Sequence, residues 1–444
     1  MAPKKSLSET YQKKTDREHI LDAPDTYLGS IVKETTENWT IGENKTEFGY
    51  DYPIVNKEFE WVPGFYKCFD EAIVNARDHV IRMKQSTNDN KHLVKSICVS
   101  FKGLTEISIY NDGDGIDIEK HPEHDIWIPE LVFGHLRTST NYDKNEKKIV
   151  GGKNGFGFKL VLIYSKWGEI ETVDHRRKLK YTQRFENNLS KICPPVIEKV
   201  KGICRPYTKI TYMPDYERFG LTKMTPEISN HLYKRVYDIA GITEKNVVVM
   251  LNNKVINVRK FQDYINMYIG EETKRLYVSD NERWEYAVCL TPFQEFTQVS
   301  FVNGINTKKG GKHVDYIINN IIKKLVALIE KKKKVKVKPV TIKEQLMIFI
   351  NCTIENPSFD SQTKEYLTTN PSNFGSTCDV SDSFIEKLAK MGIMEQAISI
   401  NELKETKEIK IRWKKTKNYK RYSKTYRRKL RWNRKRFKMH FNSL

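Results

Sequence analysis

The stretch FDEAIVNARDH, from Phe69 to His79, gives the first indication of the fold and the chemistry of this chain. Its apolar residues recur at helical spacing and form one stripe, which predicts an amphipathic helix. Glu71 and Asn75 lie one turn apart on another face of that helix. A carboxylate beside a carboxamide suits a site where Glu71 polarises an attacking water and the oxygen of Asn75 holds a magnesium ion. A solvated polar face is the alternative.

A second stretch, YNDGDGI at residues 110–116, follows two alternating runs, ICVSF and EISIY, which predict a pair of strands joined by a Lys-Gly turn. Gly113 and Gly115 let the backbone approach a ligand. Asn111, at the strand end, is placed to hydrogen-bond the edge of a base. An ordinary polar loop is the alternative.

A third stretch, GGKNGFGFK at residues 151–159, precedes the apolar run LVLIY and predicts a flexible loop that opens onto a helix. Free backbone N–H groups at a helix start attract phosphate. The stretch is not a Walker A motif, which needs Gly-Lys-Ser or Gly-Lys-Thr, and a dinucleotide fingerprint would follow a strand. A plain glycine turn is the alternative.

Together with SFDSQTK at residues 358–364, these stretches resemble the ATP site of the GHKL superfamily. The chain resembles, from about Tyr11 to about Ile411, the N-terminal ATPase region of eukaryotic-type DNA topoisomerase II, a type IIA topoisomerase. The resemblance is carried by YQKKTDREHILDAPDTYLGS, VPGFYKCFDEAIVNARDH, TSTNYD, GGKNGFGFK, SFVNGINTKKGGKHVDY and IENPSFDSQTKE. The last two motifs are peculiar to type II topoisomerases within the superfamily.

The resemblance implies a role for each matching residue, with ATP and Mg²⁺ as cofactors. Glu71 would be the general base, Asn75 the magnesium ligand and Asn111 the adenine contact. Lys364 would reach the terminal phosphate, and Tyr11 would lie on a strap that crosses to the partner subunit's nucleotide. The other implied ATP contacts are Ser139, Thr140 and Asn141, the lid residues Gly152, Lys153, Asn154, Gly155, Phe156, Gly157, Phe158 and Lys159, and Gln362 and Thr363 beside Lys364.

This sequence departs from the family pattern at two places. Phe158 stands where the family usually has a small residue, and it could alter the packing of the lid. Asp112 and Asp114 make the NDGDG loop more acidic than usual. Neither departure removes a catalytic group.

The coarse pattern of elements predicts an α+β fold twice over. The first domain mixes strands such as TKITYM with helices such as HLYKRVYDIAG, and the second begins at NVVVML and continues through WEYAVCL, TQVSFVNG and the amphipathic helix VDYIINNIIKKLVALIE. The resemblance implies a GHKL (Bergerat) α/β sandwich followed by a transducer domain of the ribosomal-protein-like β-α-β type. The expected limits are 1–28 for the strap, 29–245 for the ATPase domain, 246–411 for the transducer and 412–444 for a tail.

Four adjacent lysines, Lys331 to Lys334, follow that amphipathic helix. Family resemblance places DNA-facing lysines here, which makes Lys332, Lys333 and Lys334 candidates for contacts with DNA phosphates. A solvated helix end, where lysines favour the helix dipole, is the alternative.

The composition fits a soluble intracellular protein of two or three domains, with 444 residues and 39% hydrophobic content. No segment resembles a signal peptide or a long apolar span, so no membrane association is expected. The seven cysteines show no CxxC pairs and are expected to be reduced thiols. The expected location is the nucleus if the source is a eukaryote, and otherwise the cytoplasm or a virus.

The net charge of +21 is concentrated at the end of the chain. From Arg412 onward there are 15 Lys or Arg and no acidic residue, so the remainder carries 62 basic and 56 acidic residues, a balance of +6. The tail reads as a nucleic-acid-binding arm or as a disordered, out-of-frame product. A shift of one base permits Ile-Pro-Lys-Leu at residues 422–425 and forces a glycine and a cysteine at the family's offsets, which favours the out-of-frame interpretation.

The expected function is that of the ATP-binding and hydrolysing region of a type II DNA topoisomerase. The expected partners are double-stranded DNA, a second copy of the chain in a homodimer closed by ATP, and a separate TOPRIM and cleavage subunit if the enzyme is split. No in-frame TOPRIM motif follows the transducer, so the chain alone is not expected to cleave or relax DNA. A truncated, catalytically incompetent fragment that binds nucleotide or DNA is the alternative.

Overall fold

The computed structural model describes residues 13–42, 53–138, 147–152, 155–293 and 295–403. The chain divides into two compact units. The first takes in the described parts of 1–287, 298–316 and 348–378, and the second those of 288–297, 317–347 and 379–444. Across the described ranges, no helix combines the length and the apolar composition that a membrane span requires.

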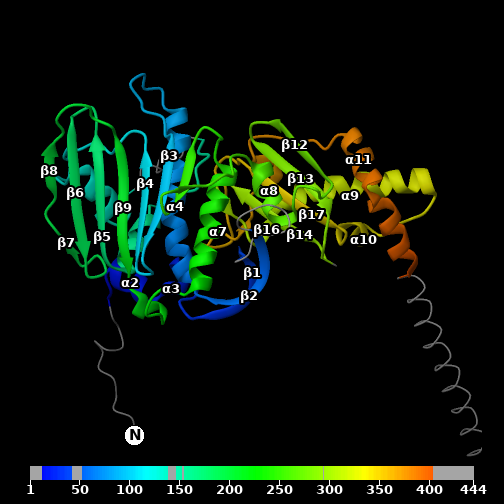
Figure 1. Cartoon of the computed structure of the whole chain (residues 1–444), viewed down its shortest axis with the longest axis horizontal. Coiled ribbons are helices and arrows are strands. Elements are labelled where there is room, and N and C mark those ends of the chain that lie inside the picture. Colours follow the sequence, from blue (N-terminus) through cyan, green and yellow to red (C-terminus); the bar gives the residue numbers. More distant parts are fainter. Residues whose placement is uncertain (1–12, 43–52, 139–146, 153–154, 294, 404–444) are drawn as a thin grey trace, which may run out of the picture. The chain divides into compact units, whose positions relative to one another are not determined.

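The first unit contains a nine-stranded sheet in the order β11-β10-β3-β4-β9-β5-β6-β7, with β8 paired to β6 (Figure 1). Neighbouring strands are antiparallel except β10 and β3, which are parallel. The strands are β3 (Ser96–Lys102), β4 (Glu106–Asp112), β5 (Ser165–Asp174), β6 (Leu179–Glu186), β7 (Lys191–Ile192), β8 (Val196–Lys199), β9 (Tyr207–Pro214), β10 (Val248–Leu251) and β11 (Lys254–Val255).

Three helices pack on this sheet and on one another: α4 (Pro63–Gln85), α6 (Gly157–Ile163) and α7 (Pro226–Ile242). Helix α4 contacts β4, α6 contacts β5 and β9, and α7 contacts β10. Along β4, buried residues alternate with more exposed ones, as in a strand that turns one face to the core. This layering confirms the predicted α/β sandwich, and the antiparallel β3–β4 pair confirms the predicted strand pair.

Helix α4 begins with Pro63 in its first turn, where the missing N–H of proline costs no hydrogen bond. The helix contacts β4 together with α6 and α7, so it is covered on several sides. Fourteen of its 23 residues are buried, and charged residues are among them. The position of α4 inside the unit therefore brings ionisable side chains into the interior, where each requires a partner.

The other elements of the first 280 residues support this sandwich. The hairpin of β1 and β2 packs on α7, and the hydroxyl of Tyr164 donates a hydrogen bond to the carbonyl of Ile20 in α2 over 2.7 Å. These elements are β1 (Glu34–Ile41), β2 (Ile54–Trp61), α2 (Asp16–Asp22), α3 (Pro24–Tyr27), α5 (Ile128–Gly134), η1 (Tyr216–Phe219) and α8 (Phe261–Ile269).

A five-stranded sheet in the order β12-β13-β17-β14-β15 is formed by the later part of the chain. Strands β13 and β14 and the long helix α9 confirm the predictions for WEYAVCL, TQVSFVNG and VDYIINNIIKKLVALIE. The elements are β12 (Arg275–Asn281), β13 (Trp284–Leu290), β14 (Thr297–Val302), β15 (Ile305–Asn306), β16 (Gly310–Gly311), α9 (Lys312–Lys333), α10 (Pro339–Lys343), β17 (Leu346–Cys352), β18 (Tyr366–Leu367), η2 (Pro371–Asn373), α11 (Asp382–Leu388) and η3 (Ala389–Ile393).

The loop after β17 is anchored within the first unit at both of its ends. At its start, the buried amide of Asn303 donates to the carbonyl of Ile354 and accepts from the backbone N–H of Ile354, both over 2.8 Å. At its end, β18 pairs in parallel with β16. Lys364 lies two residues before the start of β18, so it is held between these two anchored ends.

The strand NVVVML corrects one predicted limit. We expected it to open the second domain at residue 246, but β10 pairs in parallel with β3, from Val248 with Ser96 to Leu251 with Val99. This strand belongs to the nine-stranded sheet, so residue 245 is too early a limit for the first domain. A short apolar run has the same appearance in either sheet, because its partner is distant in sequence. The remaining domain limits stay predictions.

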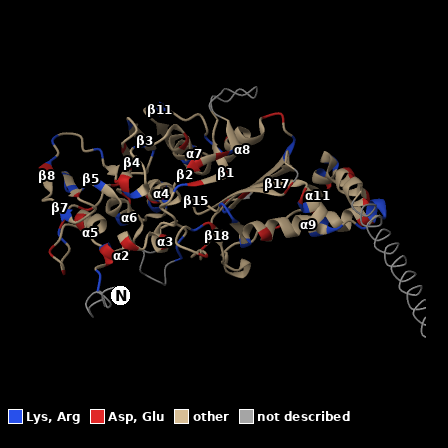
Figure 2. Ribbon diagram, turned by 90° about the horizontal axis from the view of Figure 1, so that it is seen from below, with Lys and Arg blue, Asp and Glu red and all other residues tan. Residues whose placement is uncertain are grey.

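The second unit contains the later part of α9 with α10, α11 and η3. The ammonium of Lys324 on α9 donates to the carbonyl of Val380 over 2.6 Å and pairs with Asp382 over 2.7 Å. The lysines 331–334 at the end of α9 are exposed, in a structure whose basic residues are shown in blue in Figure 2. The predicted tail, 412–444, lies outside the described residues.

Candidate active site

A buried cluster of charges lies on the first half of α4. The ammonium of Lys67 lies 2.8 Å from Oε1 of Glu71 and 3.0 Å from Oδ2 of Asp70. The other oxygen of Asp70, Oδ1, accepts a hydrogen bond from Nε of Arg235, on α7, over 2.7 Å. These four side chains are buried. They position one another and fix where the Glu71 carboxylate lies.

Lys364 joins this cluster from the loop after β17. Its ammonium lies 3.1 Å from Oε1 of Glu71 and 3.5 Å from the carbonyl oxygen of Gly151. Lys364 has φ +61°, a left-handed conformation that is costly for a side chain with a Cβ, and it is only 7% exposed. The structure thus brings together the two residues that the sequence proposed as catalytic, Glu71 and Lys364.

The charges around Glu71 favour its ionised form. Burial alone would raise the pKa of Glu71, but the ammonium groups of Lys364 and Lys67 outweigh burial and hold the pKa below its ordinary value of 4.5. Burial opposes the charge of Lys67, yet Glu71 and Asp70 raise the pKa of Lys67 above its ordinary value. The site therefore holds a carboxylate and an ammonium, both charged at neutral pH.

Two asparagines of the predicted site hold their carboxamide nitrogens in hydrogen bonds to the backbone. The Nδ2 of Asn75 donates to the carbonyl of Glu71 over 2.6 Å, one helical turn back, and this bond fixes the side chain along α4. The Nδ2 of Asn111, at the end of β4, donates to the carbonyl of Asp112 over 2.9 Å. Each carboxamide oxygen can therefore accept a ligand group, as the predicted magnesium and adenine roles require.

The start of the glycine-rich loop is fixed by a carboxylate that the sequence analysis missed. The backbone N–H groups of Gly151 and Gly152 donate to Oδ1 and Oδ2 of Asp78 over 3.0 and 2.9 Å. Burial raises the pKa of Asp78 above its ordinary value. Lys67 was missed as well. Both lie on α4 within one or two turns of Glu71, so helical spacing from Glu71 was the signal that could have found them.

Glycine is required at position 157 because of the carboxylate rather than a turn. A Cβ there would lie 2.3 Å from Oε2 of Glu71. Helix α6 begins at this residue, so Gly157, Phe158 and Lys159 belong to its first turn and not to a loop. Of the predicted lid residues, Lys153 and Asn154 lie outside the described residues, as do Ser139, Thr140, Asn141 and Tyr11.

Three of the predicted lid residues, Phe156, Phe158 and Lys159, contact different parts of the first unit. Phe158 is buried, and its ring packs edge to face on Phe133 with 5.0 Å between centroids, so its side chain belongs to the core. The ring of Phe156 lies 6.1 Å from that of Tyr27. The ammonium of Lys159 donates to the carbonyl of Thr138 over 2.8 Å, and burial lowers the pKa of Lys159 to about 8.

The residues before Lys364 are partly exposed. The hydroxyls of Ser361 and Thr363 share a hydrogen bond of 2.8 Å, and a Cβ at Gly29 would lie 3.2 Å from the methyl group of Thr363. Gln362 is half-buried. This loop therefore lies against Gly29, and it places Lys364 beside Glu71.

The chain is similar to a family model and to several known proteins. The DNA gyrase B family model matches residues 245–418. The chain is 42% identical over 415 residues to DNA topoisomerase 2 of Arabidopsis thaliana, which covers 91% of this chain and 27% of the relative. It is 44% identical over 402 residues to DNA topoisomerase 2 of Acanthamoeba polyphaga mimivirus, which covers 89% of this chain and 31% of the relative. The chain thus spans about a quarter to a third of these relatives.

Solved structures give the same assignment. The ATPase region of Saccharomyces cerevisiae topoisomerase II superimposes with a TM-score of 0.82 at 40% identity, over 89% of this chain and 99% of that one. The ATPase and transducer domains of Balamuthia mandrillaris topoisomerase II give a TM-score of 0.83 at 38% identity, over 90% and 100%. The Thermus thermophilus gyrase B ATPase domain, at 15% identity and a TM-score of 0.56, shares the fold. The chain belongs to the DNA topoisomerase II family, in which it corresponds to the N-terminal ATPase region.

Proposed function

We propose that this chain binds ATP with magnesium and hydrolyses the bond to its terminal phosphate. The observation that carries the proposal is the contact of Lys364 with Glu71 over 3.1 Å inside the first unit. A carboxylate whose pKa is lowered stays ionised at neutral pH and can accept a hydrogen bond from an attacking water. A neighbouring ammonium is the group that a transferring phosphate needs for its developing charge.

In this proposal each residue has one task. Glu71 orients and polarises the water, and Lys67 keeps the carboxylate ionised and in place. Lys364 contacts the terminal phosphate. For this contact, the ammonium of Lys364 must give up part of its interaction with Glu71 and bind the phosphate oxygens instead. The left-handed backbone of Lys364, held between β17 and β18, is the strained feature that aims the ammonium at this point.

The nucleotide itself would lie along α4 and the glycine-rich loop. The oxygen of the Asn75 carboxamide suits a hard cation that prefers oxygen ligands, so Asn75 fits a role in holding magnesium. When bound, the magnesium ion would neutralise negative charge on the phosphates. Asn111 would contact adenine. The loop from Gly152 to Lys159 and the residues Ser139, Thr140, Asn141, Gln362 and Thr363 would surround the phosphates.

We further infer that this ATPase serves DNA topology change, as the names of the relatives suggest. Closure of a homodimer by ATP through Tyr11, and contact of double-stranded DNA with Lys332, Lys333 and Lys334, belong to this inference. The exposure of the lysines at the end of α9 supports the second point. Strand cleavage is not assigned to any residue of this chain.

Two measurements on the purified chain test the proposal. Nucleotide binding is followed by calorimetry with a non-hydrolysable ATP analogue and Mg²⁺, and turnover is followed by release of inorganic phosphate from ATP. We expect saturable binding and steady phosphate release that requires Mg²⁺. Binding without turnover would make the chain a nucleotide-binding module, and the absence of both would overturn the proposal.

A further inference from the structure

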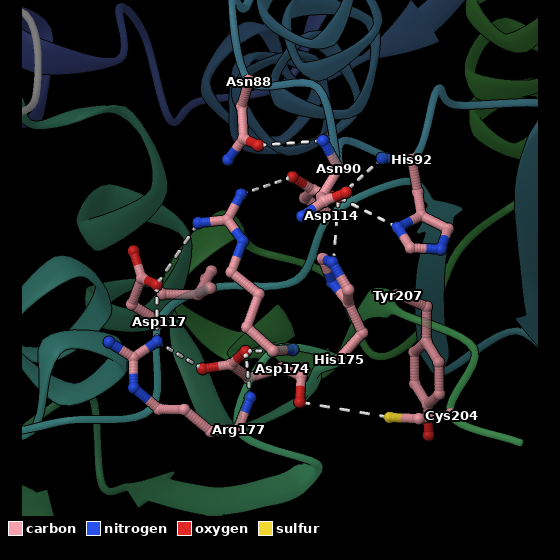
Figure 3. Close-up of polar contacts among 12 residues, drawn as sticks. Asn88, Asn90, His92, Asp114, Asp117, Asp174, His175, Arg177, Cys204 and Tyr207 are labelled. Carbon is pink, nitrogen blue, oxygen red and sulfur yellow. Dashed lines mark hydrogen bonds and ion pairs between the residues drawn. The ribbon is translucent and has the colours of Figure 1, made fainter.

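Three side chains that the ATPase proposal does not use converge at one end of the nine-stranded sheet (Figure 3). His92 lies between α4 and β3, Asp114 lies in the loop after β4, and His175 lies in the turn between β5 and β6. Their imidazole and carboxylate atoms all lie within 4.8 Å of one another. These segments are distant in sequence, and the sheet topology brings them together.

The spacing of the three groups suits a single metal ion. The Nδ1 atoms of His92 and His175 lie 3.3 and 3.8 Å from the same oxygen, Oδ1 of Asp114. Ligand atoms about 2.0–2.1 Å from a tetrahedral zinc ion lie about 3.3 Å apart, so small side-chain rotations would complete the geometry. The two imidazole rings meet edge to face, with 4.2 Å between centroids, and their Nδ1 atoms face the same carboxylate.

Hydrogen bonds from neighbouring groups hold the Asp114 carboxylate in its position between the two imidazoles. Asp114 is only 7% exposed, and its Oδ2 accepts a hydrogen bond from Arg176 over 2.9 Å. Its Oδ1 also accepts the backbone N–H of His92 over 2.8 Å, which ties the His92 segment to the loop. A carboxylate oriented by outer hydrogen bonds is typical of metal sites. The partly exposed side chain of His92, at 48%, gives an ion and its waters a route from solvent.

The local charge also favours a dication. Arg176 pairs with Asp114 and Asp117, and Arg177 pairs with Asp117, Glu119 and Asp174. This connected network holds four carboxylates and two guanidinium groups, which leaves an excess of two negative charges. A bound divalent cation would compensate that excess.

We propose that His92, Asp114 and His175 form a binding site for a divalent transition-metal ion of the zinc type, with water as the remaining ligand. Two imidazoles and one carboxylate suit zinc and its neighbours better than magnesium, which prefers oxygen ligands alone. The ion would join the segment before β3, the NDGDG loop and the β5–β6 turn. It would thereby stiffen the loop that follows Asn111, at a position separate from the phosphate end of the ATP site.

The test is a titration of the full chain with Co²⁺ and with Zn²⁺, free of nucleotide, magnesium and any histidine tag. We expect one Co²⁺ per chain, with the visible absorption of a low-coordinate nitrogen and oxygen site. The variants His92→Ala and His175→Ala should each weaken binding by about tenfold or more. Zn²⁺ should raise the melting temperature of the native chain and not that of His92→Ala. The side chain of His92 is exposed, so His92→Ala should fold as the native chain does.

The double variant His121→Ala, His124→Ala is the matched control. It removes two neighbouring histidines, whose rings stack with 4.7 Å between centroids, and it should leave Co²⁺ binding unchanged. Equal affinity of the native chain and both single variants would overturn the proposal. A thiolate charge-transfer band would also overturn it, because the metal would then belong to cysteines.

Discussion

The ammonium of Lys364 lies 3.1 Å from Oε1 of Glu71, although 293 residues separate the two in sequence. Because Glu71 lies inside α4 and Lys364 lies on the loop between β17 and β18, their contact joins two segments of the first unit through one buried ion pair. A nucleotide phosphate that competes for Lys364 would weaken this pair. The contact is therefore both part of the proposed catalytic site and a link between the segments that hold it.

Glu71→Gln should retain nucleotide binding and lose turnover. The amide keeps the size of the side chain but cannot take a proton from water, and the loss of a general base lowers the rate by about a hundredfold or more. Phosphate release and calorimetric binding of a non-hydrolysable analogue measure the two effects. Glu217→Gln, at an exposed residue on η1, is the control and should behave as the native chain. Native turnover in Glu71→Gln would remove Glu71 from the mechanism.

Lys364→Ala and Lys364→Gly should both slow hydrolysis, because each deletes the ammonium that faces the terminal phosphate. They should differ in stability. Alanine keeps the strain of φ +61° whereas glycine relieves it, so the glycine variant should melt at the higher temperature of the two. Lys178→Gly tests the relief of backbone strain alone, since Lys178 has φ +53° in the β5–β6 turn. If Lys364→Gly hydrolyses ATP at the native rate, Lys364 has no catalytic role.

Lys67→Met should change the pH dependence of the site. Removing one of the two ammonium groups lets burial raise the pKa of Glu71, so the acid limb of the pH–rate profile should move to higher pH. The folded pKa of Glu71 lies below 4.5, so its ionisation stabilises the native chain at neutral pH, and this contribution is lost as pH falls below about 4.5. In Lys67→Met that contribution is smaller.

Loss of a buried partner should also lower the free energy of unfolding of Lys67→Met by about 3 kcal/mol or more. Lys84→Met, on the same helix, removes an exposed pair with Glu244 and should cost less than about 1 kcal/mol. Urea unfolding at several pH values measures both variants. An unchanged acid limb in Lys67→Met would show that Lys67 does not set the ionisation of Glu71.

Local patterns predicted α4, the β3–β4 pair and α9, because the apolar residues of these elements recur at helical or alternating spacing in the sequence. The same periodicity places Lys67 one turn and Asp78 two turns from Glu71, but it could not show that these charged side chains are buried. On a helix with one solvated face, charged residues indicate exposure, but α4 is covered on several sides and its charges are buried. Their partners, Asp70, Glu71 and two backbone N–H groups, become evident only when the fold is known.

Pairings between distant segments could not be predicted from the sequence for a related reason. The run Val248–Leu251 is apolar in any buried sheet, and nothing in it specifies a parallel partner in β3. His92, Asp114 and His175 have no regular spacing and resemble isolated polar residues of three loops. In contrast, Glu71, Asn75 and Asn111 could be proposed as site residues because each lies in a short motif whose local structure already places the side chain.

The combined variant Lys332→Ala, Lys333→Ala, Lys334→Ala should weaken DNA binding and reduce its salt dependence. Each lysine that neutralises a phosphate adds about 0.9 to the slope of log K against log salt, so loss of all three contacts should lower the slope by about 2.7. These lysines are exposed, and substituting them should leave the melting temperature and basal ATPase unchanged. Fluorescence anisotropy with duplex DNA over a range of salt concentrations measures the slope.

The control for that experiment is Lys223→Ala, Lys245→Ala, Lys254→Ala, which removes the same charge from exposed positions of the first unit. This comparison is needed because the 15 basic residues from Arg412 onward are expected to bind DNA without specificity and to dominate the total affinity. General attraction to a basic chain predicts equal losses in the two triple variants, whereas a DNA contact at the end of α9 predicts a larger loss there. Equal slopes in the two variants would therefore assign these lysines to the solvated end of a helix.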